Sequence, residues 1–278
     1  TDTDKYLNSR AYLHVVGTDP ETDKPLIGTG VQGSLPVTPV DYPFVQAYAG
    51  SPYMLAVISH GADPASTVYV AKARADGSTT PWVKVVDVDD KVSNVVPHGD
   101  RLYLVSYKDT PRRRVLAVSA DAPDLAKAEV VVPAGERVIQ DIGASADALY
   151  VTDLDGGLGR LRRYDFATKA IADVALPIDG TIGGPAYDPA STDLVLGMTN
   201  WITPPAWYRL RAGKAAALNL APPWKEDTSG YVVEEVKAPS WDGTPIPLSI
   251  VHRKDIRLDG SHAIWLTGYG AYGASINP

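Results

Sequence analysis

Residues 53–70 read YMLAVISHGADPASTVYV: an apolar run, a polar turn with Gly and Pro, and a second apolar run that contains a tyrosine. Short runs rich in Val, Ile and Tyr, bounded by turn residues, predict a pair of antiparallel β-strands. The same layout occurs three more times, at residues 102–118, 149–164 and 194–210. The chain therefore contains an internal repeat, and this repeat determines its fold class.

The period of the repeat predicts a β-propeller. The first strand of each copy is anchored at Tyr53, Tyr103, Tyr150 and Val195, with spacings of 50, 47 and 45 residues. Such a period, with about four strands in each unit, is typical of propeller blades, whereas leucine-rich, tetratricopeptide and ankyrin repeats are shorter. A further copy at residues 12–16 brings the prediction to four or five blades. The alternative is an all-β sandwich with coincidental spacing, and the regularity of the spacing favours the propeller.

A second domain is predicted after the repeats. Residues 221–224 (Ala-Pro-Pro-Trp) have the composition of a linker, and residues 231–252 contain two apolar runs around an Asp-Gly turn, a strong hairpin signal. Residues 263–266 then form an apolar run of strand character that leads into Gly268-Tyr269-Gly270. Buried parallel strands of α/β sheets deliver loops to the working edge in this way. We predict propeller over residues 1–226 and the beginning of an α/β domain over residues 227–278.

The composition excludes several classes of function. The chain has 278 residues and a net charge of −7, which argues against nucleic acid or an anionic membrane as partner. It has no cysteine, which excludes disulfides, thiolate metal sites and a cysteine nucleophile. The five histidines are not spaced as zinc ligands, so neither a metal nor a cofactor is predicted. No apolar run reaches the roughly 18 residues of a membrane span. The composition does not distinguish a cytoplasmic from a periplasmic protein.

Three further motifs have simpler structural explanations. Residues 28–33 (Gly-Thr-Gly-Val-Gln-Gly) match a dinucleotide-binding fingerprint by letter, but prolines follow where that motif needs a helix, which favours a glycine-rich turn. Residues 153–157 (Asp-Leu-Asp-Gly-Gly) resemble part of a calcium loop without its bidentate Glu, which favours a hairpin turn. The basic triplet at residues 112–114 is predicted to lie in a solvated loop between strands, where propellers also bind partners.

Tyr269 is the best candidate for chemistry. A neutral phenol on a glycine-flanked loop donates a strong hydrogen bond at neutral pH, as one arm of an oxyanion hole must. The alternative, which the sequence supports equally well, is that Tyr269 only packs against its neighbours at a glycine-rich corner of the chain. The chain has no Gly-x-Ser-x-Gly nucleophile motif, so these residues alone cannot run covalent hydrolysis.

Residues 231–278 resemble the prolyl oligopeptidase family of serine peptidases. The resemblance is carried by Trp-Asp-Gly-Thr at 241–244, by Ile-Val-His-Arg-Lys at 250–254 and by Leu-Thr-Gly-Tyr-Gly-Ala-Tyr at 266–272. Upstream it is looser, with family-like segments at residues 14–18 and 60–64. It thus spans nearly the whole chain and is strongest at the end.

The resemblance implies a seven-bladed propeller joined to an α/β-hydrolase domain that cleaves short peptides after proline with a Ser-Asp-His triad. Tyr269 would supply one oxyanion donor, and the propeller loop carrying Ser59 and Ala62 would face the substrate's outer pocket. The triad itself would lie beyond Pro278, so the chain alone is expected to be inactive and its full-length parent to be a monomeric peptidase. The alternative is a non-catalytic propeller interaction module with a degenerate hydrolase remnant.

Overall fold

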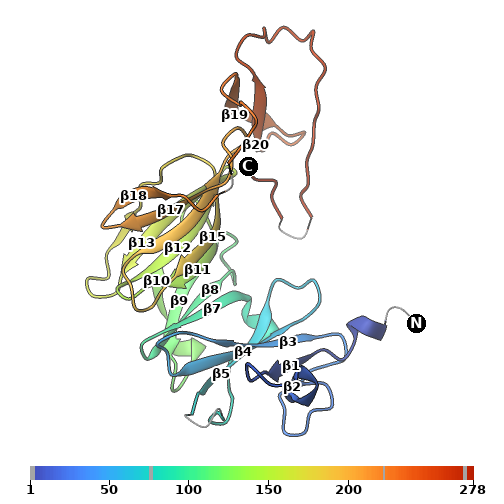
Figure 1. Ribbon diagram of the computed structural model, residues 1–278, viewed down its shortest axis with the longest axis vertical. Coiled ribbons are helices and arrows are strands. Elements are labelled where there is room, and N and C mark those ends of the chain that lie inside the picture. The colour runs from blue at the N-terminus through green and yellow to red at the C-terminus, as the bar shows by residue number, and fades with distance from the viewer. Residues whose placement is uncertain (1–3, 75–77, 222, 272–273) are drawn as a thin grey trace. The chain divides into compact units, whose positions relative to one another are not determined.

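The computed structural model describes residues 4–74, 78–221, 223–271 and 274–278, and β-strands account for nearly all of its regular structure (Figure 1). Four antiparallel sheets contain four strands each, and strands adjacent in sequence are adjacent in the sheet. Their strands are β3 (Tyr42–Ala47), β4 (Tyr53–Ser59), β5 (Ser66–Lys72) and β6 (Val83–Val86); β7 (Val92–His98), β8 (Arg101–Ser106), β9 (Arg114–Ser119) and β10 (Glu129–Val132); β11 (Val138–Ala144), β12 (Ala148–Asp155), β13 (Leu158–Asp165) and β14 (Ile171–Asp173); and β15 (Thr181–Tyr187), β16 (Leu194–Thr199), β17 (Ala206–Arg211) and β18 (Lys214–Leu218).

Two-stranded sheets and single helical turns complete the described elements. The two sheets pair β1 (Arg10–Leu13) with β2 (Lys24–Gly28), and β19 (Tyr231–Pro239) with β20 (Pro245–Arg253). The four 3₁₀ turns are η1 (Asp4–Tyr6), η2 (Pro20–Thr22), η3 (Val88–Asp90) and η4 (Leu125–Lys127). Among the described residues, no helix is long and apolar enough to cross a lipid bilayer.

The four repeat copies coincide with the four four-stranded sheets, one copy to each sheet. Their anchors Tyr53, Tyr103, Tyr150 and Val195 lie in β4, β8, β12 and β16, which are the second strands of the sheets rather than the first. The sequence signal is strong there because the second strand is one of the two inner strands of each sheet, which are paired on both sides and largely buried. The predicted fifth copy at residues 12–16 begins in β1, which pairs only with β2.

The chain forms two compact units, Thr1–Gly135 and Glu136–Pro278. In the first unit, the core lies between the β3–β6 and β7–β10 sheets and is made of interdigitating branched and aromatic side chains: Tyr53, Leu55, Val68, Val70, Val85, Val86, Val92, Val95, Leu102, Leu104, Leu116 and Val118. The Tyr53 hydroxyl donates to Asp121 Oδ1 at 2.8 Å, and Lys72 Nζ contacts the same carboxylate at 2.7 Å. A polar contact therefore reinforces the apolar seam between these two sheets.

In the second unit, the core lies between the β11–β14 and β15–β18 sheets and contains Ala148, Tyr150, Leu161, Leu194, Leu196, Met198 and Leu210. Tyr187, at the end of β15, stacks on Tyr150 with ring centroids 6.2 Å apart. Its ring also covers Gly143 of β11, where a Cβ atom would lie 2.5 Å from Cζ and closer still to Cε2 and Cδ2. Glycine is thus required at residue 143 by the approach of a neighbouring sheet.

The structure agrees with the simpler explanation of both turn motifs. After β2, Gly28, Gly30 and Gly33 all have positive φ and no helix begins there, so a dinucleotide phosphate has no helix N-terminus to bind. Gly156 and Gly157 form the two-residue turn between β12 and β13, both with positive φ. Asp153 is fully buried and accepts two bonds from Arg162, at 2.6 and 2.7 Å, so its carboxylate is occupied by an ion pair.

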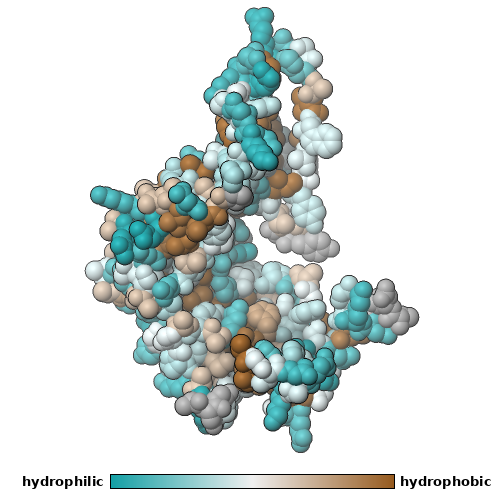
Figure 2. Space-filling model, viewed as in Figure 1, coloured by the Kyte–Doolittle hydropathy of each residue, from teal (hydrophilic) through white to brown (hydrophobic). Residues whose placement is uncertain are grey.

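The β19–β20 hairpin is formed as predicted, with nine paired positions and a turn in which Gly243 has φ of 82°. The predicted strand at residues 263–266 is wrong for this structure: the segment is extended but unpaired, and Ile264, Trp265 and Leu266 are 85%, 92% and 79% exposed. A strand needs a neighbour to satisfy its backbone groups, and no described segment pairs with this one. Figure 2 shows apolar side chains open to solvent along this C-terminal segment.

Candidate functional site

Ser59 and Ala62, the two predicted substrate contacts, lie at the end of β4 and in the loop that follows it. Ser59 is the last residue of β4, is half-buried, and is paired with Tyr42 of β3 and Ser66 of β5. Ala62 lies at the tip of the loop and is exposed. The Asp63 side chain accepts from the Ala65 amide at 2.8 Å, which fixes the return of the chain into β5. Ala62 therefore projects from a loop whose backbone is held in one conformation.

A hydrogen-bonded histidine, His60, holds the start of this loop in place. His60 Nδ1 lies 2.8 Å from Asp41 Oδ1, and its Nε2 lies 2.9 Å from Thr67 Oγ1. Burial raises the pKa of Asp41, but hydrogen bonds from Thr38 and His60 outweigh it and the net pKa is lowered. These two contacts give His60 a structural role. Asp41 was not identified from the sequence, because nothing in the local pattern links it to a histidine 19 residues away.

The β8–β9 loop borders the β4–β5 loop. In a four-stranded antiparallel meander, the first strand begins, the second and third strands join, and the fourth strand ends at the same edge of the sheet. The β4–β5 loop therefore lies at the edge where β6 ends, and the β8–β9 loop at the edge where β7 begins. The β6–β7 connection joins these two edges. Tyr107, the first residue after β8, has a pKa raised mainly by burial, with a further contribution from the Asp63 carboxylate and an opposing one from Arg113. The basic triplet of residues 112–114 and the loop that carries Ala62 thus lie at the same edge of two packed sheets.

Tyr269, the predicted oxyanion donor, lies in the extended segment of the second unit and is 57% exposed. Its neighbours Gly268 and Gly270 have open space where a Cβ would lie, so sterics do not require glycine at either position. Tyr272 of the same motif and Pro222 of the predicted linker lie outside the described residues. The role of Tyr269 remains a prediction.

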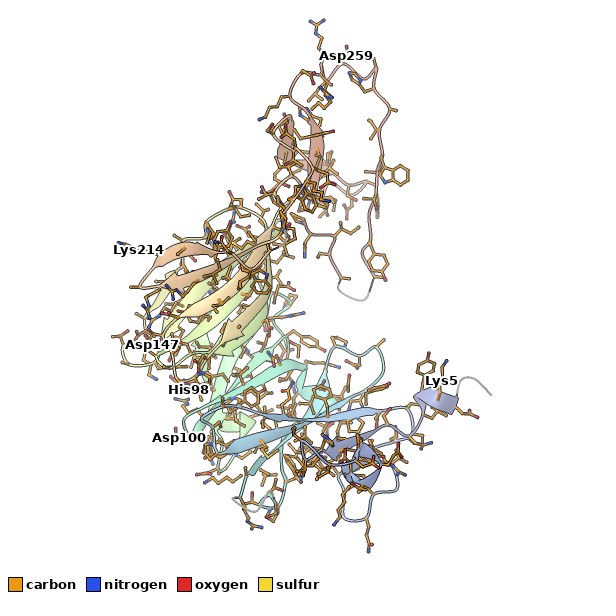
Figure 3. The ribbon with its side chains drawn as sticks, viewed as in Figure 1. Lys5, His98, Asp100, Asp147, Lys214 and Asp259 are labelled. Atoms are coloured by element: carbon orange, nitrogen blue, oxygen red, sulfur yellow. The ribbon has the colours of Figure 1, made fainter. Side chains whose placement is uncertain are left out.

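Two cavities lie in the second unit, between the β11–β14 and β15–β18 sheets. The larger, about 420 Å³, is lined in part by Tyr150, Arg163 and Asp147, which is labelled at the β11–β12 loop in Figure 3. Arg163 bonds Asp147 at 2.7 Å and Asp165 at 2.8 Å, so its charge is already neutralised. The smaller cavity, about 210 Å³, includes Thr152 and Thr181, whose buried hydroxyls have no hydrogen-bond partner among the described residues.

Across the described part of the chain, no group of three or more His, Cys, Asp or Glu side chains is arranged to hold a metal ion. Three histidines instead pair with a carboxylate each: His14 with Asp23, His60 with Asp41 and His252 with Glu234.

Comparison with known proteins identifies the family. Residues 1–220 match the sequence model described as the prolyl oligopeptidase N-terminal β-propeller domain, which covers more than half of the chain. The chain belongs to the prolyl oligopeptidase family. The prediction of a propeller is therefore confirmed, and each four-stranded sheet is a blade of a prolyl oligopeptidase propeller.

Individual relatives of the chain also belong to peptidases of this kind by name. It is 27% identical over 286 residues to the prolyl endopeptidase of Elizabethkingia meningoseptica, which covers 99% of the chain and 37% of the relative. It is 40% identical over 83 residues to dipeptidyl aminopeptidase BI of Pseudoxanthomonas mexicana, which covers 29% of the chain and 12% of the relative. The chain thus spans little more than a third of the length of the prolyl endopeptidase.

Solved structures match the fold of this chain. Prolyl oligopeptidase B from Galerina marginata, bound to a 35mer hydrolysis and macrocyclization substrate, superposes with a TM-score of 0.82 at 19% identity, covering 98% of this chain and 38% of that one. Oligopeptidase B from Leishmania major gives a TM-score of 0.74 at 20% identity, covering 96% and 38%. At these identities the likeness extends to the fold alone.

Proposed function

We propose that this chain is the propeller portion, with the opening segment of the hydrolase domain, of a serine peptidase that cleaves short peptides after proline. The observation that carries the proposal is the match of residues 1–220 to the family propeller, followed by a β19–β20 hairpin and the Gly-Tyr-Gly segment. The triad that forms and hydrolyses the acyl-enzyme is expected outside residues 1–278.

In this proposal the propeller selects substrates by size. A cavity covered by blades admits a flexible peptide and excludes a folded protein. Ser59 and Ala62 contact the outer part of the peptide, and the His60–Asp41 pair holds their loop in place. The Tyr269 hydroxyl donates to the oxyanion of the tetrahedral intermediate, together with a backbone amide.

The test compares the full-length protein with the isolated 278-residue chain. We expect the full-length protein to react with a fluorophosphonate and to cleave a short peptide with Pro before the scissile bond. Matched peptides with Ala or Arg at that position, and a folded protein with an exposed proline loop, should be cleaved far more slowly. The isolated chain should neither react with the fluorophosphonate nor cleave the peptide, because it supplies no triad.

If the Arg peptide is cleaved faster than the Pro peptide, the proposed specificity for proline is wrong and specificity for basic residues takes its place. If the full-length protein neither reacts with the fluorophosphonate nor cleaves any peptide, the non-catalytic interaction module becomes the better explanation.

A further inference from the structure

The β8–β9 loop concentrates positive charge in an otherwise acidic protein. Lys108, Arg112, Arg113 and Arg114 lie within seven residues that contain one acidic side chain, Asp109, while the chain as a whole has a net charge of −7. The loop is ordered by its own hydrogen bonds: the Arg113 amide donates to Thr110 O at 2.7 Å, and Arg113 has φ of 65°. The backbone that carries these cations is therefore ordered.

Among the described residues, Arg112 and Arg114 have no aspartate or glutamate partner, unlike several other arginines of the chain. Arginines 137, 160, 162, 163 and 211 each bond an aspartate at 2.6 to 2.9 Å. Neither Arg112 nor Arg114 forms an ion pair within residues 4–74, 78–221, 223–271 and 274–278. Arg112 is exposed, whereas Nε of Arg114 is buried without a hydrogen-bond partner. A partly buried guanidinium without an anionic partner is unfavourable, so an anion that paired with the accessible nitrogens of Arg114 would gain binding energy.

The position of the loop indicates what that anion belongs to. The β8–β9 loop lies at the same edge as the β4–β5 loop, and the Asp63 carboxylate of the β4–β5 loop contributes to the raised pKa of Tyr107, the first residue after β8. A guanidinium is planar and pairs with a carboxylate through two parallel hydrogen bonds, which a compact ammonium cannot do. A peptide that extended beyond Ala62 along this edge would run toward the β8–β9 loop, which carries Arg112 and leads into Arg114.

We propose that Arg112 and Arg114 bind a carboxylate of the peptide substrate, so that the enzyme favours short peptides carrying an anionic group beyond the outer pocket. The proposal rests on the proposed peptidase function and adds a substrate class to it. The carboxylate has two possible sources, the peptide's C-terminus and an acidic side chain.

The test uses the full-length protein and four proline-containing peptides of equal length. One has a free C-terminus, one a C-terminal amide, and two are amidated with either Glu or Gln at the outermost position. We expect at least one carboxylate peptide to exceed its neutral match about 10-fold in kcat/KM, through KM, and this preference to fall as salt rises. Comparison of the two pairs identifies the source of the carboxylate.

Three variants locate the preference. Arg112→Gln and Arg114→Gln should each remove most of it while changing kcat/KM for the neutral peptides by less than about twofold, since those peptides lack the carboxylate. Arg114→Lys should keep only part of it, because the charge remains and the planar donor pair is lost. The matched control is Arg101→Gln, at the opposite end of β8, where the arginine already pairs with Glu129 at 2.7 Å; the preference should remain.

Binding of the same labelled peptides, measured by fluorescence anisotropy, separates this inference from the peptidase function. Carboxylate-dependent binding without cleavage would contradict the peptidase and support the arginine site. Cleavage and binding that are equal for charged and neutral peptides would overturn the arginine site. An equal loss for both kinds of peptide in Arg112→Gln, which is an exposed loop change, would also overturn it.

Discussion

Replacing Gly143 with Ala should break the seam between the two sheets of the second unit. An alanine Cβ would lie 2.5 Å from Cζ of Tyr187 and closer to two other ring atoms, whereas carbon atoms in contact normally lie about 3.5–4.0 Å apart. The ring has little freedom to retreat because it also stacks on Tyr150. Overpacking of this kind costs about 1–3 kcal/mol, and we expect about 3 kcal/mol because both sides of the contact are held in place. The melting temperature should fall by roughly 6–12 °C.

The neighbouring sheet offers a matched control for this substitution. Gly183 of β15 also lies in a strand and has open space where a Cβ would lie, so Gly183→Ala should change stability by less than about 0.5 kcal/mol. In a Tyr187→Ala background the ring is gone, and Gly143→Ala should then cost less than about 0.5 kcal/mol. Urea unfolding followed by tryptophan fluorescence measures all four variants. Equal destabilisation by the two glycine substitutions, or additive effects in the double variant, would refute the steric argument.

Three further predictions concern single side chains. Tyr269→Phe in the full-length protein should lower kcat/KM by about 10²-fold with stability unchanged, whereas Tyr272→Phe should have little effect; equal effects would defeat the oxyanion assignment. Asp153→Ala should destabilise the protein by about 3 kcal/mol in urea unfolding, because it leaves Arg162 without its buried partner, and a loss under about 1 kcal/mol would contradict this. Because the pKa of Asp41 is lowered in the folded state, its ionised carboxylate stabilises the fold at pH values above the unfolded-state pKa of about 4, and this contribution is lost as the pH falls through the folded-state pKa. Asp41→Asn should therefore reduce the loss of unfolding free energy at acid pH. An unchanged loss in urea unfolding across this pH range would argue against this role.

The sequence was sufficient to predict the blades because each blade repeats the same burial pattern. Buried second strands such as β4 and β12 leave dense apolar runs, and turn residues between them mark the period. The position of the repeat within each sheet was harder to predict, because some outer strands leave almost no apolar pattern: β14 and β18 are short and are exposed along nearly their whole length.

The candidate site was less accessible to sequence reasoning than the fold. Ser59 and Ala62 were selected by resemblance, and the contact that holds their loop joins His60 to Asp41, two residues in different strands or turns. The error at residues 263–266 has a related cause. Apolar composition indicates that a segment will be buried, but the strand forms only where a neighbouring strand completes its hydrogen bonds.

The two seams described above are built from different chemistry, and this limits how the repeats can be rearranged in evolution. Between β3–β6 and β7–β10, Tyr53 needs the carboxylate of Asp121, whereas between β11–β14 and β15–β18, Tyr187 needs the bare backbone of Gly143. A recombination event that exchanged or deleted a blade would leave a tyrosine facing a neighbour without its carboxylate or its glycine. Although the blades share one strand layout, each of these two seams depends on a residue pair of its own, so blades could be exchanged only together with the partner residue that each tyrosine needs.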